Sequence, residues 1–111
     1  MKEQTFGKLI PATSASSFAG FVYMISVQDR HYIGKKSFRK GSDWRTYQSS
    51  NKEIKELLKQ SEGSYQVLAY AETERHLTYL EAKFLFSAEA LENPCFVNGN
   101  ILGKFYRSRL R

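Results

Sequence analysis

The chain has few of the residues that cross-link or stiffen small proteins. Its 111 residues include one cysteine and two prolines. The single cysteine, Cys95, excludes an internal disulfide and a zinc site with several cysteines, and it fits a reducing compartment. No apolar run approaches the roughly 20 residues that cross a bilayer, and the N-terminus lacks the apolar core of a signal peptide. We therefore expect a cytoplasmic protein with no membrane partner.

The chain also has fewer acidic than basic residues. Lysine and arginine total 17 against 11 aspartates and glutamates, which gives a formal charge of +6 and a pI near 9.5. Such a balance favours a polyanionic partner, although many small proteins are basic without one. The positions of the basic residues along the chain favour nucleic acid as the partner, because in residues 35–45 and 104–111 the cations alternate with aromatic residues. The candidate nucleic-acid contacts are Lys35, Lys36, Arg39, Lys40, Arg45, Lys104 and Arg107.

The remaining composition is that of a folding protein. Hydrophobic residues make up 41% of the chain and aromatic residues 14%, so a packed core is expected. The length suits a single domain over 1–111, and it is too short for a catalytic domain plus an independent recognition domain.

The first half of the chain predicts a β-hairpin. Residues 1–20 are rich in Ser, Thr and Ala, and we expect a loosely structured lead-in with one short strand over 6–10. Strands are predicted over 21–27 and 31–36. If Asp29 and Arg30 centre the turn, Tyr23 faces Lys36, and Tyr23, Tyr32 and Lys36 share one face of the sheet. A three-residue loop breaks this alignment, so the register stays open.

The second half predicts helices around a third strand. Ser50 and Glu53 form a capping-box pattern for a helix over 50–60, and residues 65–71 predict a mostly buried strand. Thr73 caps a long helix that runs to about residue 91, followed by a short extended segment over 96–102 with a turn near residues 98 and 99. The predicted fold class is α/β (α+β), with a small mixed or antiparallel sheet of about three strands flanked by helices.

One acid of the long helix lies on its apolar side. On a helical wheel Glu81 falls within the arc of Leu77 and Phe84, and a carboxylate removed from water needs a partner. Mg²⁺ is one such partner, and a salt bridge to Lys or Arg is the alternative that the wheel alone favours. Tyr79 and Phe86 lie on the opposite face, where they either pack under the N-terminal segment or form a homodimer contact.

These features together resemble the GIY-YIG nuclease superfamily, and within it the small phage domains similar to Seg-type homing endonucleases. The resemblance covers about four fifths of the chain in the expected order. In the first motif Phe21-Val22 replace Gly-Ile, but the tyrosine is kept. The segments that carry the resemblance are Phe21-Val22-Tyr23, Tyr32-Ile33-Gly34-Lys35-Lys36, Trp44-Arg45-Thr46-Tyr47-Gln48-Ser49-Ser50, Glu81 within Tyr79-Leu80-Glu81-Ala82-Lys83, and Asn98.

The resemblance implies a role for each of these side chains. Tyr23 acts as, or positions, the base that activates a water, with a pKa depressed by cations such as Lys36. Tyr32 orients the water or a phosphate oxygen, and Glu81 holds one divalent cation. An arginine clamps the phosphate; Arg45 is preferred to Arg39 for this role because of its place in the Trp44 to Ser50 segment. Asn98 binds near the metal and phosphate.

The implied activity is hydrolysis of DNA by a Mg²⁺- or Mn²⁺-dependent endonuclease encoded by a phage and acting in the host cytoplasm. Two alternatives stay open. One is a basic nucleic-acid-binding module that kept the fold and lost catalysis, and the other is a protein-interaction domain whose tyrosines belong to the core. The joint presence of Tyr23, Tyr32, Glu81 and Asn98 argues against lost catalysis, because a decayed copy is expected to have lost at least one of them.

Overall fold

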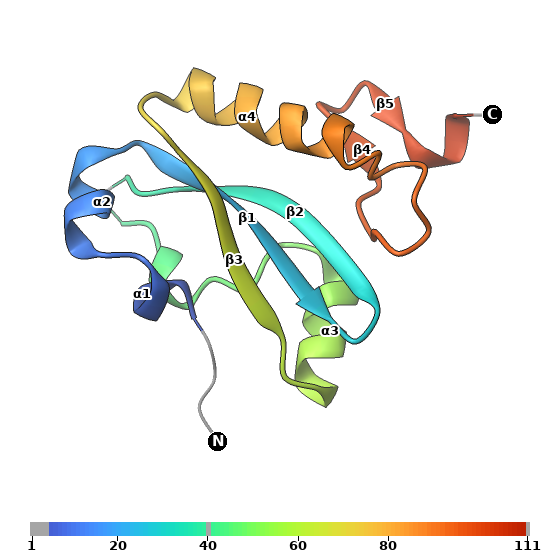
Figure 1. Ribbon diagram of the computed structural model, residues 1–111, viewed down its shortest axis with the longest axis horizontal. Helices are drawn as coiled ribbons and strands as arrows, with labels where there is room; N and C mark the ends of the chain where they lie inside the picture. Colours follow the sequence, from blue (N-terminus) through green and yellow to red (C-terminus); the bar gives the residue numbers. More distant parts are fainter. Residues whose placement is uncertain (1–4, 40, 111) are drawn as a thin grey trace.

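Three antiparallel strands form the centre of the protein (Figure 1). The computed structural model describes residues 5–39 and 41–110. The strand order is β2-β1-β3, and both neighbouring pairs are antiparallel. The strands are β1 (Gly20–Val27), β2 (Arg30–Ser37) and β3 (Ser64–Ala71). The expected α/β class with a three-stranded antiparallel sheet and flanking helices is confirmed.

The turn of the β1–β2 hairpin lies one residue earlier in the chain than expected. It consists of Gln28 and Asp29, and Gln28 adopts a positive φ of 56°, a conformation that two-residue hairpin loops require. Tyr23 therefore pairs with Gly34, and the expected pairing of Tyr23 with Lys36 is wrong by two residues. A shift of two residues preserves the faces of a strand, so the common face predicted for the two tyrosines and Lys36 holds.

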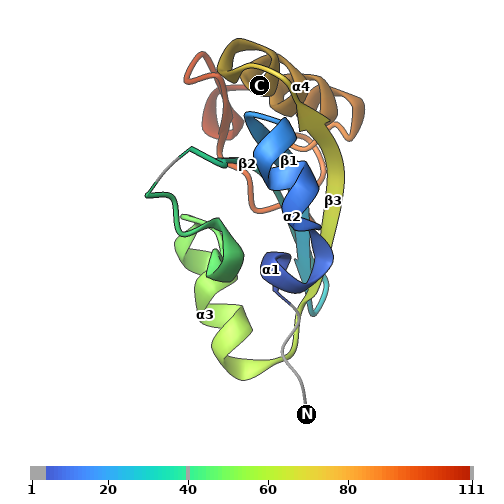
Figure 2. The same ribbon diagram turned by 90° about the vertical axis from the view of Figure 1, so that its left-hand side faces the viewer.

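One side of the sheet, here called the tyrosine face, is covered by short elements. Figure 2 shows α1 and α3 on this side of the strands. The covering elements are α1 (Phe6–Leu9), α2 (Ala12–Ser17), the 3-10 turn η1 (Trp44–Thr46) and α3 (Lys52–Gln60). Their core with the sheet includes Phe21, Tyr23, Ile25, Trp44, Ile54 and Tyr65.

The N-terminal segment is part of this core. Phe6 is fully buried, and its ring lies 5.0 to 5.1 Å from the rings of Phe21, Tyr23 and Tyr65. The expected strand over 6–10 is wrong, since residues 6–9 form a helical turn. The expected loose lead-in is also wrong for residues 5–20, because a buried aromatic ring fixes this segment to the sheet.

Two further local expectations are corrected. Helix α3 begins one residue later than expected, because the side chain of Asn51, and not Ser50, accepts the bond from the Ile54 N–H at 3.0 Å. Strand β3 lies at the edge of the sheet, and only Tyr65 and Ala71 of its eight residues are buried. An edge strand has one neighbour fewer, so less of its surface is covered.

The other side of the sheet is covered by α4 (Glu74–Ser87), and is here called the α4 face. The predicted cap is confirmed, since Thr73 accepts a hydrogen bond from the His76 N–H at 3.0 Å. The helix ends before residue 91, because Glu89 has a positive φ of 51° and the Ala90 N–H bonds back to the Leu85 carbonyl. This pattern is a Schellman ending.

The chain then runs along the outer edge of β2. The His31 N–H donates to the Cys95 carbonyl at 2.8 Å, and the Val97 N–H donates to the His31 carbonyl at 2.9 Å. A small hairpin of β4 (Asn100–Ile101) and β5 (Phe105–Tyr106) follows, with its turn near Leu102 instead of residues 98 and 99. The exposed edge of β2 is thus partly covered.

Arg107 holds this C-terminal segment together. Its guanidinium donates to four backbone carbonyls at 2.6 to 3.3 Å, those of Ala90, Asn93, Phe96 and Asn98. Such charge-assisted bonds fix the loop that precedes β4.

None of the helices within residues 5–39 and 41–110 is long and apolar enough to span a membrane.

Candidate active site

A polar cavity of about 260 Å³ opens at the outer edge of β2. It brings together three predicted site residues from distant parts of the sequence, namely Tyr32, Glu81 and Asn98. They come from β2, from α4 and from the C-terminal segment. The other lining residues are Ser50, Asn51, Leu85, Gly99, Asn100 and Leu102.

Glu81 is half-buried on α4 and lines this cavity. Burial raises the pKa of its carboxyl, and the charge of Lys35 partly offsets that effect. Within residues 5–39 and 41–110 Glu81 forms no ion pair, so the salt bridge favoured by the helical wheel is not found. The Lys35 ammonium instead donates to the Thr78 hydroxyl at 2.8 Å. A desolvated carboxylate without an ion-pair partner is suited to hold a cation.

Tyr32 is the predicted tyrosine that reaches the cavity. Burial raises the pKa of its phenol most strongly, a hydrogen bond with Ser50 acts in the opposite direction, and the negative charge of Glu81 raises the pKa further. The phenol and the carboxylate are therefore coupled electrostatically. A change of charge at Glu81 alters the acidity of Tyr32.

Tyr23 lies behind Tyr32 and does not line the cavity. Its side chain is 1% exposed, and its ring centroid is 6.2 Å from that of Tyr32 and 5.8 Å from that of Tyr47. Burial raises the pKa of the Tyr23 phenol, and the expected depression by Lys36 is wrong. The Lys36 ammonium instead pairs with Asp43 at 3.2 Å and lies 4.2 Å from the centre of the Tyr47 ring.

Gly34 makes room for the Tyr23 ring. A Cβ atom at this position would lie 2.6 Å from the Tyr23 hydroxyl oxygen and 2.9 Å from a ring carbon of Tyr32. Tyr23 lies opposite Gly34 in the sheet, so the glycine accommodates a side chain of the protein itself.

Asn98 is buried, and its amide pairs with the backbone of β2. Its side-chain oxygen accepts from the Ile33 N–H at 3.1 Å, and its side-chain nitrogen donates to the Ile33 carbonyl at 2.8 Å. The amide thus acts like one further residue of a β-ladder. These two bonds hold the C-terminal wall of the cavity against the strand that carries Tyr32.

Ser49 is a residue of the site that the sequence did not single out for a role. It is 1% exposed and has a positive φ of 86°, and its hydroxyl accepts from the Asn51 N–H at 2.9 Å. The same side chain hydrogen-bonds with the phenols of Tyr23 and Tyr32 and lowers the pKa of each. Strained residues of this kind often belong to functional sites. The one local signal was the polar run that follows Tyr47.

Among the described residues, none of the predicted cations lines the cavity. Arg39 and Lys36 border a separate hollow of about 240 Å³. Arg45 places its guanidinium 4.6 Å from the centre of the Trp44 ring and packs against Gly7. Lys104 is exposed in the C-terminal hairpin, and the Lys40 prediction lies outside the described residues.

Comparison with known proteins identifies the family. A family model described as "Putative endonuclease segE, GIY-YIG domain" matches residues 4–101. The chain belongs to the GIY-YIG nuclease superfamily. The matched residues include the three strands, α4 and all the cavity-lining residues except Leu102, whereas β5 and η2 (Arg107–Arg109) lie beyond them. No curated protein and no solved structure matches the chain.

GIY-YIG nucleases generally depend on a divalent metal, and the cavity residues suit one. Among the described residues no three His, Cys, Asp or Glu side chains cluster as a metal site. The cavity nevertheless offers the Glu81 carboxylate together with the hydroxyl oxygens of Tyr32 and Ser50. Mg²⁺ is commonly held by one or two carboxylates, with phosphate and water as the remaining ligands.

Proposed function

We propose that this protein is a metal-dependent endonuclease that hydrolyses phosphodiester bonds of DNA. The observation that carries the proposal is the meeting of Tyr32, Glu81 and Asn98 in one polar cavity. Membership of the GIY-YIG superfamily supports it, and so does the formal charge of +6.

Glu81 is the proposed metal ligand, with Mg²⁺ or Mn²⁺ as the cation. Its carboxylate is partly desolvated and has no ion-pair partner among the described residues, so a cation is favoured there. When bound, the cation neutralises charge that develops on the phosphate. Asn98 holds the wall of the cavity in place through its bonds to Ile33.

The two tyrosines take different roles in this proposal. Tyr32 lines the cavity, so its phenol orients and activates the attacking water. The negative charge of Glu81 contributes to the raised pKa of the Tyr32 phenol. A cation bound to the Glu81 carboxylate would offset that charge and so favour the phenolate form of Tyr32. Tyr23 is buried behind it and positions Tyr32 together with Ser49.

The basic residues of β2 and of the segment that follows it are the proposed DNA contacts. Lys35 and Lys36 leave β2 on opposite faces: Lys35 bonds to Thr78 of α4, and Lys36 lies over Tyr47. Arg39 and Arg45 belong to the segment after β2, and we assign Arg45 a contact with the scissile phosphate or its neighbour. Lys40 extends this set, whereas Lys104 lies in the C-terminal hairpin. Arg107 is left out, because backbone carbonyls occupy its guanidinium.

The decisive experiment compares Glu81→Gln with Glu72→Gln, an exposed acid that precedes α4 and serves as the matched control. With plasmid DNA and Mg²⁺, we expect Glu81→Gln to reduce cleavage by about 1,000-fold, since a metal ligand contributes several kcal/mol. DNA binding, measured by fluorescence anisotropy, should stay within about threefold of wild type for both variants. Glu72→Gln should cleave like wild type.

Two outcomes would contradict the proposal. If wild-type protein binds DNA but does not cut it across divalent metals and pH, the domain is a binding module that has lost catalysis. If Glu81→Gln cuts as fast as wild type, the metal ligand is another residue.

Separate Arg39→Ala and Arg45→Ala variants identify which arginine clamps the phosphate. The clamping arginine is the one whose substitution lowers turnover far more than DNA affinity.

A further inference from the structure

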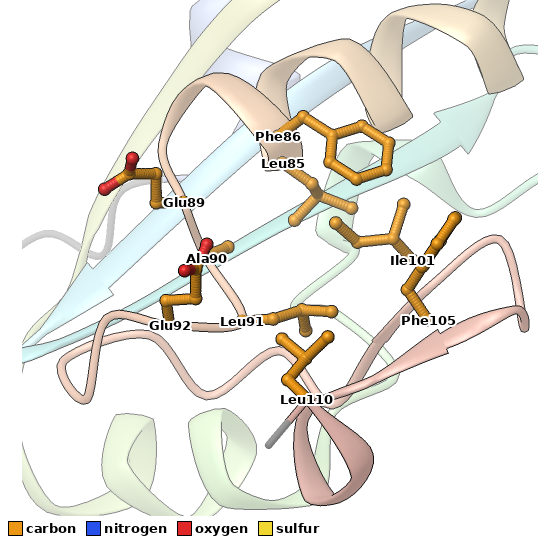
Figure 3. A pocket seen from close by; sticks show the side chains of 9 residues that line it. All are labelled: Leu85, Phe86, Glu89, Ala90, Leu91, Glu92, Ile101, Phe105 and Leu110. Carbon is orange, nitrogen blue, oxygen red and sulfur yellow. The ribbon is translucent and has the colours of Figure 1, made fainter.

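The end of α4 and the C-terminal hairpin enclose a second hollow, of about 190 Å³ (Figure 3). Phe86, Phe105 and Leu110 stand around it, and Glu89 and Glu92 lie together on one side. We call this surface the C-terminal patch. It lies outside the proposed catalytic cavity, but Leu85 contributes to the walls of both.

The patch exposes large apolar side chains. Phe86 is 51% exposed, and Phe105 and Leu110 are each 45% exposed. The two rings contact each other with centroids 5.6 Å apart, so they form one continuous surface. Phe86 therefore does not pack under the N-terminal segment, which was one of its two predicted locations. Grouped apolar side chains of this kind mark interaction sites more often than single ones.

The side chains that line the hollow are apolar or acidic, which does not suit DNA as their ligand. Glu89 and Glu92 are exposed, and no cation among the described residues lines the hollow. Phosphates would be repelled there, although the chain as a whole carries a formal charge of +6. A complementary partner would have exposed apolar side chains next to lysine or arginine.

The patch itself offers such side chains. Lys104 precedes Phe105 at the start of β5, and Arg109 precedes Leu110 at the end of η2. Lys104 and Arg109 are both exposed. Acids on one side and bases next to the apolar side chains make the surface complementary to a copy of itself.

We infer that the occupant of the C-terminal patch is a second copy of this chain, related by a two-fold axis. Phe86, Phe105 and Leu110 of the two copies meet at the centre, and Glu89 and Glu92 of each copy face Lys104 and Arg109 of the other. Burial of the apolar side chains stabilises the pair. The charges fix its orientation.

This pairing does not depend on the nuclease assignment, but it has a consequence for it. Because Leu85 contributes to the walls of both the catalytic cavity and the C-terminal patch, a dimer through the patch holds two catalytic cavities in one assembly. The strands of duplex DNA are antiparallel, so one cavity can act on each strand. A dimer is then expected to make double-strand cuts, and a monomer to make nicks.

The test uses charge reversal and a measurement of mass in solution. Wild-type protein should show twice the monomer mass of 12.8 kDa in sedimentation velocity, with the proportion of dimer rising with concentration. Glu89→Lys/Glu92→Lys should be monomeric, and so should Lys104→Glu/Arg109→Glu, because like charges then face each other. An equimolar mixture of these two variants should form a mixed dimer.

Controls separate this proposal from unfolding and from loss of activity. Glu62→Lys/Glu72→Lys changes the net charge as much as Glu89→Lys/Glu92→Lys, but away from the patch, and should leave the dimer intact. Circular dichroism should show that all variants are folded. A monomeric wild-type chain, or a mixture that stays monomeric, overturns the inference. Neither result bears on the nuclease proposal, since cleavage is measured separately with Glu81→Gln.

Discussion

The two faces of the sheet are built differently. The tyrosine face is covered by short elements that interlock aromatic rings, including those of Phe6, Phe21 and Trp44. The α4 face is covered by one long helix with aliphatic contacts to Val22 and Ile33. The first face contributes the tyrosines of the proposed site, and the second contributes Glu81.

The site forms where these two layers meet at the edge of β2. Tyr32 and Ser50 reach the cavity from the tyrosine face, while Glu81 reaches it from α4. The C-terminal segment closes the cavity through Asn98. Each face can therefore be disturbed separately, and the results should differ in kind: changes on the tyrosine face should affect packing and water activation, whereas changes at Glu81 should affect cation binding.

The largest effect on folding is expected from Gly34→Ala on the tyrosine face. The added methyl group would lie 2.6 Å from the Tyr23 hydroxyl oxygen, and the fully packed ring has no space to move. We expect the free energy of unfolding to fall by about 3 kcal/mol, as measured by urea denaturation.

Gly99→Ala is the matched control for this prediction. Its added Cβ atom would have no neighbour within 4 Å, so its stability should lie within about 0.5 kcal/mol of wild type. Equal stability of the two variants would show that the Tyr23 ring is not packed over Gly34.

The next largest effect separates the two tyrosines. Tyr32→Phe removes the phenol that lines the cavity and should slow cleavage by about 100-fold, in the range of general acid–base catalysis. Tyr23→Phe removes a buried hydroxyl from a supporting position and should slow cleavage by only about tenfold. Both variants should stay folded, and Tyr79→Phe, on an exposed part of α4, should change neither rate nor stability.

The reverse order of these rates would show that Tyr23 contacts the water and Tyr32 supports it. A collapse of thermal stability in Tyr23→Phe would instead identify this tyrosine as a core residue without a role in cleavage. The pH dependence of cleavage adds a second criterion, because only the residue that contacts the water should change it.

The smallest effect on stability is predicted at Glu81, and it depends on pH. Burial raises the pKa of this carboxyl, so the folded protein binds the Glu81 proton more tightly than the unfolded chain does. Its contribution to stability is full below the ordinary pKa of 4.5 and is lost as the pH rises through the higher folded value. Glu81→Gln stays neutral, so at pH 7 its free energy of unfolding should be higher than that of wild type.

Thermal unfolding at pH 4 and pH 7 measures whether Glu81→Gln is more or less stable than wild type. The difference between Glu81→Gln and wild type should disappear at pH 4, and Glu72→Gln should match wild type at both values. At pH 7, added Mg²⁺ should stabilise wild type and leave Glu81→Gln unchanged, since only the carboxylate attracts the cation. A destabilised Glu81→Gln without metal would show that the carboxylate already has a protein partner.

Much of the fold could be predicted from local patterns. The hairpin, the third strand and the Thr73 cap depend on residue alternation and on capping side chains, which are properties of short segments. The N-terminal helices were missed because Phe6 is held by rings from distant strands. The hairpin register was missed because the turn depends on a positive φ at Gln28, which few residues other than glycine or asparagine signal in a sequence.

The sequence by itself determined which residue types are available: two tyrosines on alternate positions of one sheet face, one acid on the apolar arc of a helix and an excess of basic residues. Only the tertiary structure decided where these side chains lie and which groups they contact. It placed Tyr32 in the cavity and Tyr23 behind it, gave Glu81 no ion-pair partner among the described residues, and occupied Arg107 with backbone carbonyls. Burial and pKa depend on neighbours brought together by folding, so no local pattern records them.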